Sequence, residues 1–248
     1  MARADRQLRK RVPLPSHAIY TRWTLPGPTD QLVVDLTFHT DPGSEVGLYY
    51  APWNGYIDDQ LFYFGVQTDV HHPDGHSTGK GWIFSTWWTF DLADTRIPPE
   101  GFVQQGTHEG TFVGVRRHLD WTVGDAVARL RRGDPDGDGD WFELWVESNG
   151  QAPVWIGSLR FKRSDPSVPA QIAPTGPAFL EVYSDVSRYA DIPEWHLDAM
   201  VRGCLQAVSD YPAFPTAEVP NSDTYYDPIR HRVHALFGER VHAPGPLF

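Results

Sequence analysis

The chain has 248 residues, of which 40% are hydrophobic and 21% charged, and its formal net charge is −11. This size and composition allow one large core and exclude a disordered chain, and no apolar run reaches the roughly 20 residues that a membrane-spanning helix needs. The acidic balance argues against a nucleic-acid partner, which would require a basic face. Because Cys204 is the only cysteine, no internal disulfide can form.

The first 15 residues are basic and end in Pro13 and Pro15. We expect a flexible arm there, followed by a single domain over residues 16–248. The arm lacks the apolar stretch of a secretory signal, so the sequence as it stands predicts a cytoplasmic protein. The mature form of a secreted protein would look the same. Nothing in the sequence indicates an oligomeric state.

Short runs rich in aromatic and β-branched residues recur along the rest of the chain, separated by Gly, Pro, Asp and Asn, which is typical of an all-β sandwich or barrel. The runs that predict strands are Leu32–Phe38, Gly47–Ala51, Leu61–Thr68, Trp82–Phe90, Thr111–His118, Ala126–Arg131, Trp141–Glu147, Val154–Phe161, Phe179–Tyr183 and Arg232–Phe237. Asn149-Gly150 is a strong signal for a hairpin. We therefore expect one antiparallel β-sandwich.

Residues 191–209 fit two patterns. Asp191 could cap a helix with Leu197 and Val201 on its apolar face, but Trp195, Leu197 and Val201 also alternate with polar residues as in a strand. Gly203 would cost a helix about 1 kcal/mol. A strand is therefore favoured.

Several predicted strands carry large aromatic and polar side chains opposite their apolar side. In residues 61–70, Phe62 and Phe64 belong to the core, whereas Tyr63 and Gln67 point the other way. The same side of the other strands adds Asp35, His39, Trp87, Arg116, His118, Trp145 and Tyr183. Such aromatics would expose apolar area unless something covers them. Sugar rings, with apolar C–H faces and polar edges, match this composition, so a carbohydrate-binding face is predicted. The alternative is that another segment of the chain covers it.

The same face offers carboxylates for catalysis. Glycoside hydrolysis needs two of them across the scissile bond, and Glu143 and Glu181 are the candidates for this pair. Arg116 or His118 beside Tyr63 could instead serve a polysaccharide lyase. A third hypothesis is an intracellular biosynthetic or interaction protein that binds a polar small molecule. Binding without cleavage is the leading hypothesis of the three.

One acidic loop resembles the start of a calcium-binding loop, because carboxylates alternate with glycine and proline in it. Its candidate Ca²⁺ ligands are Asp134, Asp136, Asp138 and Asp140. The twelfth position of such a loop is Trp145 rather than Glu, and the flanks have strand patterns. An acidic hairpin without metal is therefore the alternative.

The loop histidines His71, His72 and His76 lack the spacing of a helical zinc site, so we interpret them as polar loop residues. No organic cofactor is predicted.

Four motifs carry a resemblance to a known family. FYFGVQ, WIFSTWW, HEGTFVGVRRHLDWTVGD and WIGSLRF occur in this order within residues 45–185. The chain thereby resembles the bacterial domain-of-unknown-function family 3472. The resemblance implies a jelly-roll or concanavalin A-like sandwich of the lectin-glucanase type and a polysaccharide-related role, but it assigns no catalytic residue. The matching positions are Tyr63, Gly65, Gln67, Ser85, Trp87, Glu109, Gly110, Trp121 and Gly124.

Overall fold

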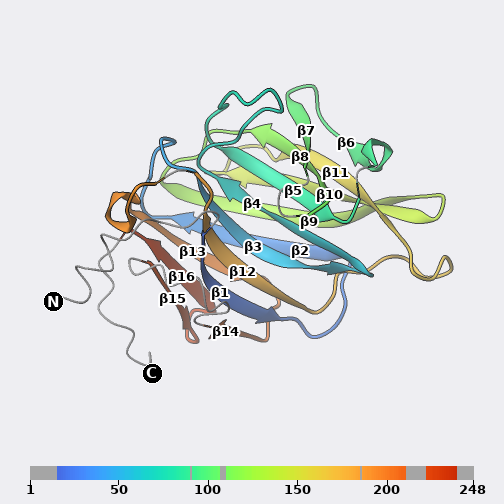
Figure 1. The fold of residues 1–248 in the computed structure, drawn as a ribbon. Helices are drawn as coiled ribbons and strands as arrows, with labels where there is room; N and C mark the ends of the chain where they lie inside the picture. The colour runs from blue at the N-terminus through green and yellow to red at the C-terminus, as the bar shows by residue number, and fades with distance from the viewer. Residues whose placement is uncertain (1–15, 90, 107–109, 185, 211–221, 239–248) are drawn as a thin grey trace.

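The computed structural model describes residues 16–89, 91–106, 110–184, 186–210 and 222–238. The expected N-terminal arm and Glu109 lie outside these ranges. Within them, two antiparallel sheets of eight strands each form a sandwich, with two short 3₁₀ turns at Leu92–Asp94 and Tyr189–Asp191 (Figure 1). The predicted all-β sandwich is thus confirmed. No helix in the described part of the chain is long and apolar enough to cross a membrane.

Sheet A has the strand order β14-β1-β12-β3-β4-β5-β8-β7. Its strands are β1 (Ser16–Thr24), β3 (Leu48–Ile57), β4 (Gln60–Gln67), β5 (Gly81–Trp87), β7 (Gly101–Gly106), β8 (Phe112–His118), β12 (Thr175–Val182) and β14 (Gln206–Asp210).

Sheet B has the order β15-β16-β13-β2-β9-β10-β11-β6. Its strands are β2 (Gln31–Phe38), β6 (Thr95–Arg96), β9 (Gly124–Asp136), β10 (Gly139–Ser148), β11 (Val154–Lys162), β13 (Trp195–Val201), β15 (Ser222–Asp227) and β16 (Arg232–Phe237).

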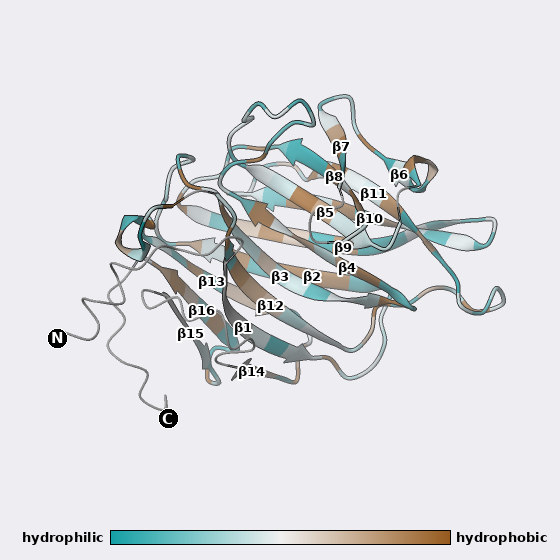
Figure 2. Cartoon of the chain, in the orientation of Figure 1, coloured by the Kyte–Doolittle hydropathy of each residue, from teal (hydrophilic) through white to brown (hydrophobic). Residues whose placement is uncertain are grey.

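The core lies between the sheets, because each strand sends alternate side chains inward. Phe62 and Phe64 of β4 enter it from sheet A, and Phe142 and Leu144 of β10 enter it from sheet B, all fully buried. Full burial of such a side chain contributes about 1.5–3 kcal/mol. The strands in Figure 2 accordingly carry alternating brown and teal segments. The residues that point away from the core therefore form two separate outer faces, one on each sheet.

Local turn chemistry agrees with the sequence. Asn149 and Gly150 adopt positive φ angles of 50° and 70°, and they begin the loop 149–153 that joins β10 to β11 in an antiparallel hairpin. The ambiguous residues 191–209 form β13 and β14, separated by a turn in which Gly203 has a φ of +76°. The strand interpretation is therefore confirmed.

Two tryptophans lie where simple patterns would not place them. Alternation along β5 would put Trp88 on the core side with Phe84, but Trp88 is 63% exposed because β5 ends at Trp87 and a φ of 66° breaks the alternation. The run Trp53-Asn54-Gly55 has the composition of a turn, but Trp53 is fully buried in β3, where the pairing with β4 shifts register between Tyr50 and Trp53.

Candidate functional site

The two sheets divide the predicted site. The outer face of sheet A, with the residues that directly follow its strands, carries Tyr63, Gln67, Trp87, Arg116, His118, Glu181 and Tyr183. The outer face of sheet B, again with the residues that directly follow its strands, carries Asp35, His39, Glu143 and Trp145. The expectation of one shared face is therefore wrong, because alternation separates the two sides of a strand but does not tell which sheet the strand joins. Glu143 and Glu181 cannot flank one scissile bond from opposite sides of the sandwich.

The carboxylates on sheet B are neutralised by neighbouring strands. Glu143 Oε2 accepts hydrogen bonds from Arg131 Nη2 at 3.1 Å and from Trp145 Nε1 at 3.0 Å. Asp35 accepts two bonds from the guanidinium of Arg202, at 2.8 and 2.6 Å. These groups have the partners expected of a solvated sheet surface.

A second group on sheet B centres on Asp198, which is 8% exposed. Its carboxylate lies 3.1 Å from His39 Nε2 and 2.6 Å from His234 Nδ1. The Tyr225 ring stacks on His234 with centroids 4.4 Å apart. His39 therefore belongs to an Asp–His network on sheet B, far from the tyrosines with which it was grouped.

The outer face of sheet A has an aromatic floor. Tyr49, Ala51, Ile83 and Phe179 form a buried cluster that is separate from the main core, with Tyr63 packed against it. The ring centroid of Tyr49 lies 6.0 Å from that of Tyr63 and 5.5 Å from that of Phe179. Tyr49 was not among the predicted site residues. Its position between Leu48 and Tyr50, whose side chains enter the core, was the signal that it faces outward.

Gly65 makes room for this floor. A Cβ atom at position 65 would lie 2.1 Å from the carbonyl oxygen of Tyr50 and 2.9 Å from the Tyr49 ring. The Tyr49 ring therefore lies close against β4, where any larger residue would displace it. The half-buried Trp87 extends the aromatic surface along β5, with its ring 5.8 Å from that of Tyr63.

Arg116 is the most unusual group on this face. It is only 9% exposed, and its Nη1 donates a hydrogen bond to Gln67 Oε1 at 3.2 Å. Its Nε is buried and has no partner, and none of the described carboxylates lies within ion-pair distance of the guanidinium. By contrast, Arg163 donates two hydrogen bonds of 2.8 Å to the buried carboxylate of Asp140.

Burial lowers the pKa of Arg116 from its usual value, and the surrounding Tyr63, Tyr183, Tyr49 and Glu181 oppose that shift. The guanidinium still keeps its proton, because arginine is not deprotonated in proteins. The site therefore holds a largely buried positive charge, with the carboxylate of Glu181 near enough to act on it.

Two hydroxyl groups of sheet A are also unsatisfied. The side-chain oxygens of Tyr49 and Ser85 are buried without a hydrogen-bond partner. Burial raises the pKa of Tyr49 well above its usual value, so its hydroxyl stays protonated and can donate. Buried polar groups without partners are rare in proteins and often mark a place where a ligand or water binds.

Tyr183 and His118 lie at the rim. The Tyr183 hydroxyl donates to the backbone oxygen of Asp69 and accepts from its N–H at 3.2 Å, so it holds the loop after β4. Burial raises the pKa of Tyr183. His118 is exposed at the end of β8, with Nε2 3.7 Å from Asp120.

The acidic loop is the hairpin between β9 and β10. Asp136 accepts a bond from Trp141 Nε1 at 3.0 Å, and Asp140 is paired with Arg163. Asp138 lies 3.7 Å from Arg160, and Asp134 is exposed. Among the described residues these carboxylates do not converge on a metal position. Calcium binding here stays a prediction without geometric support.

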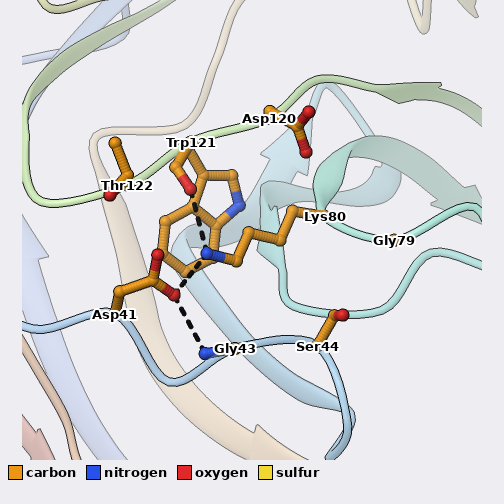
Figure 3. A pocket seen from close by; sticks show the side chains of 8 residues that line it. All are labelled: Asp41, Gly43, Ser44, Gly79, Lys80, Asp120, Trp121 and Thr122. Carbon is orange, nitrogen blue, oxygen red and sulfur yellow. Dashed lines mark hydrogen bonds and ion pairs between the residues drawn. The ribbon is translucent and has the colours of Figure 1, made fainter.

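A pocket of about 550 Å³ opens beside β5 (Figure 3). Lys80 crosses it over the Trp121 ring, 4.5 Å from the centroid, and its ammonium donates to Asp41 and to the Trp121 carbonyl. Because the Lys80 ammonium already has these partners, the pocket has fewer free polar groups for a ligand than the face around Arg116.

Comparisons with known proteins give little. No family model matches the chain, and no curated protein matches it. The resemblance to family 3472 therefore stays a prediction. Among solved structures, the marine PL-14 alginate lyase from Aplysia kurodai is similar at a TM-score of 0.25 and 10% identity, covering 64% of this chain and 70% of that one. The likeness is distant, and the sandwich assignment depends on the strand pairing of this chain itself.

Proposed function

We propose that the outer face of sheet A binds a carboxylate-bearing sugar ring, as found in acidic polysaccharides. The observation that carries this proposal is the buried guanidinium of Arg116, which has an amide partner in Gln67 but no carboxylate partner among the described residues. A charged side chain is almost never fully buried unless it is paired. A ligand carboxylate would give the guanidinium the direct ion-pair partner that Glu181, which acts on it electrostatically, does not supply.

The arginine is oriented for this role. Gln67 occupies Nη1, so Nε remains on the part of the guanidinium that has no partner. Arginine binds carboxylates through two parallel N–H bonds, and the geometry of the guanidinium makes such pairs specific as well as strong. The Gln67 amide also holds the guanidinium in one orientation before the ligand arrives, which reduces the entropy cost of binding.

The surrounding side chains suit a sugar. Tyr63 and the half-buried Trp87 present ring faces to the apolar C–H side of a pyranose. A small polar ligand with a carboxylate would satisfy Arg116 equally well. The two kinds of ligand are distinguished by whether the affinity depends on the length of the saccharide chain.

Cleavage by β-elimination is the second candidate. That reaction removes the proton from the carbon next to the carboxylate and breaks the glycosidic C–O bond at the neighbouring carbon, so that a C=C bond forms and the leaving oxygen takes up a proton. A buried arginine and amide would stabilise the negative charge that develops on the carboxylate. Hydrolysis by Glu143 and Glu181 is not proposed again, because they face opposite sides of the sandwich.

The test is a panel of acidic polysaccharides (alginate and polygalacturonate) and neutral ones (dextran and mannan) in affinity electrophoresis with purified protein. We expect retardation by at least one acidic polymer, lost in Arg116→Met and kept in the control Arg131→Met on sheet B. Retardation by neutral polymers alone would refute the proposal. Ultraviolet absorbance of an unsaturated uronate in the same incubations would identify a lyase, and its absence would leave a binding protein.

A further inference from the structure

We propose that the hairpin between β4 and β5 binds one divalent transition-metal ion, with Zn²⁺ as the best match, through His72, Asp74 and His76. The proposal does not depend on the function of the Arg116 face. It concerns a loop that the sequence alone gave no reason to treat as a metal site, because the histidines are not spaced as on a helix.

The backbone brings the three side chains together. His72 N–H donates to His76 O at 2.9 Å, and Gly75 N–H donates to His72 O at 2.8 Å. Gly75 adopts a φ of +90°, which turns the chain back on itself. His71 and Ser77 form the next pair of the hairpin. The three candidate ligands are thus presented by one tight turn of the backbone.

The donor atoms are close enough for one ion. The Nδ1 atoms of both histidines face Asp74 Oδ1, at 3.2 Å for His72 and closer for His76, and the three ligand atoms all lie within 4.8 Å of one another. Tetrahedral zinc has bonds of about 2.0–2.1 Å, which places ligand atoms about 3.3 Å apart. Side-chain rotations in an exposed hairpin can supply the remaining adjustment.

The ring contacts hold the two imidazoles side by side. His72 stacks on His76 with centroids 4.9 Å apart, and its ring also lies 5.1 Å from that of Phe102. His72 Nδ1 is buried and lies 3.2 Å from the Asp74 oxygen. Two imidazoles arranged in this way can both direct a ring nitrogen at one metal ion.

The donor set indicates which metal binds. Two imidazole nitrogens and one carboxylate suit zinc and its neighbours, whereas calcium prefers oxygen ligands alone. This hairpin is therefore chemically distinct from the acidic loop at Asp134–Asp140. Three protein ligands leave a fourth position open for water or another ligand, as in zinc sites that exchange ligands.

A metal here would also stiffen the edge of the Arg116 face. The hairpin joins β4, which carries Gln67, to β5, and His72 packs against Phe102, which pairs with Arg116 across β7 and β8. An ion that fixed the hairpin would hold these neighbours in place.

The experiment is a calorimetric titration of Zn²⁺ alone into the full chain, free of any affinity tag and stripped with a chelator. We expect one site per chain, with the affinity lowered at least about tenfold in His76→Gln and in Asp74→Asn, since even the outer partners of metal ligands are worth that much. His71→Gln is the matched control, because His71 lies on the same hairpin but bonds to Asp69 instead, and it should bind zinc as the wild type does.

Visible absorbance of the Co²⁺ form gives a second measurement, with tetrahedral bands expected in the wild type and missing in His76→Gln. Melting temperatures without metal should agree among the three variants, because the changed side chains are exposed. Equal zinc affinity in wild type and His76→Gln, or no measurable binding, would overturn the proposal. Neither result would affect the expected binding of acidic polymers at Arg116.

Discussion

If the role of Arg116 is to bind a ligand, the unliganded protein should become more stable when Arg116 is replaced by an apolar residue. We expect the double variant Arg116→Met, Gln67→Met to raise the free energy of unfolding. The wild type buries a guanidinium that has one hydrogen bond and no described carboxylate within ion-pair distance. Both methionine side chains follow the stems they replace, and neither partner of the hydrogen bond between Arg116 and Gln67 is left behind without the other.

The magnitude follows from these contacts. Replacing a buried ionic group and its partner by apolar side chains of similar size is neutral or stabilises by about 1–4 kcal/mol. Arg116→Met alone gains less, because it leaves the Gln67 oxygen buried without a donor, at a cost of about 1–3 kcal/mol. Urea unfolding at neutral pH measures the free energy of unfolding of both variants, and that of the double variant should be the higher.

Arg163→Met is the control, since the same change there strands the carboxylate of Asp140, which is 2% exposed. It should lower the urea midpoint. If the double variant at Arg116 and Gln67 lost as much stability as Arg163→Met, the guanidinium would have a structural partner, and the reasoning for a ligand site would fail.

Three further predictions concern the rest of the molecule. The Arg163 hydrogen bond holds the pKa of Asp140 below its usual value, so the stability that ionised Asp140 contributes is present above the unfolded pKa of about 4 and is lost as pH falls through the folded pKa. Asp140→Asn should therefore lower the urea midpoint at pH 7 and approach the wild-type midpoint in acid. A difference in midpoint that stayed constant with pH would contradict this. Tyr183→Phe removes two hydrogen bonds to Asp69 and should cost about 1–3 kcal/mol in calorimetric unfolding, whereas an unchanged transition would mean that water replaces them. Glu143→Gln should leave binding to acidic polymers unchanged, because it lies on sheet B, and weaker binding would place the site there.

The sequence predicts the strands of this protein better than their arrangement. Alternation correctly gave Phe62 and Phe64 to the core and Tyr63 and Gln67 to an outer face, because the period of two is a local property of the backbone. Alternation did not predict strands that are short or weakly patterned. An example is Gly101–Gly106, which has a glycine at each end and two consecutive glutamines, so that it shows no alternation of apolar and polar residues.

The candidate site could be predicted only in part, because its geometry is non-local. Gln67 and Arg116 meet although 49 residues separate them. The register places Gln67 opposite Gly81 and Arg116 opposite Ile83, so the two side chains approach diagonally across β5, and Gly81 has no side chain to stand between them. Strand order and register depend on the whole fold, which is why Glu143 and Glu181 were placed together in error.

The most direct test of the central claim is a calorimetric titration with one oligosaccharide in two forms. A uronate oligosaccharide taken from the polymer that binds, and the same oligosaccharide with its carboxyl groups reduced to alcohols, are each titrated into wild type and Arg116→Met. The account predicts that the wild type binds the acidic form, and that either change lowers the affinity at least about 30-fold, the equivalent of about 2 kcal/mol for a buried charge pair. Equal affinity of the wild type for both forms would contradict it, because the buried guanidinium would then have no part in binding.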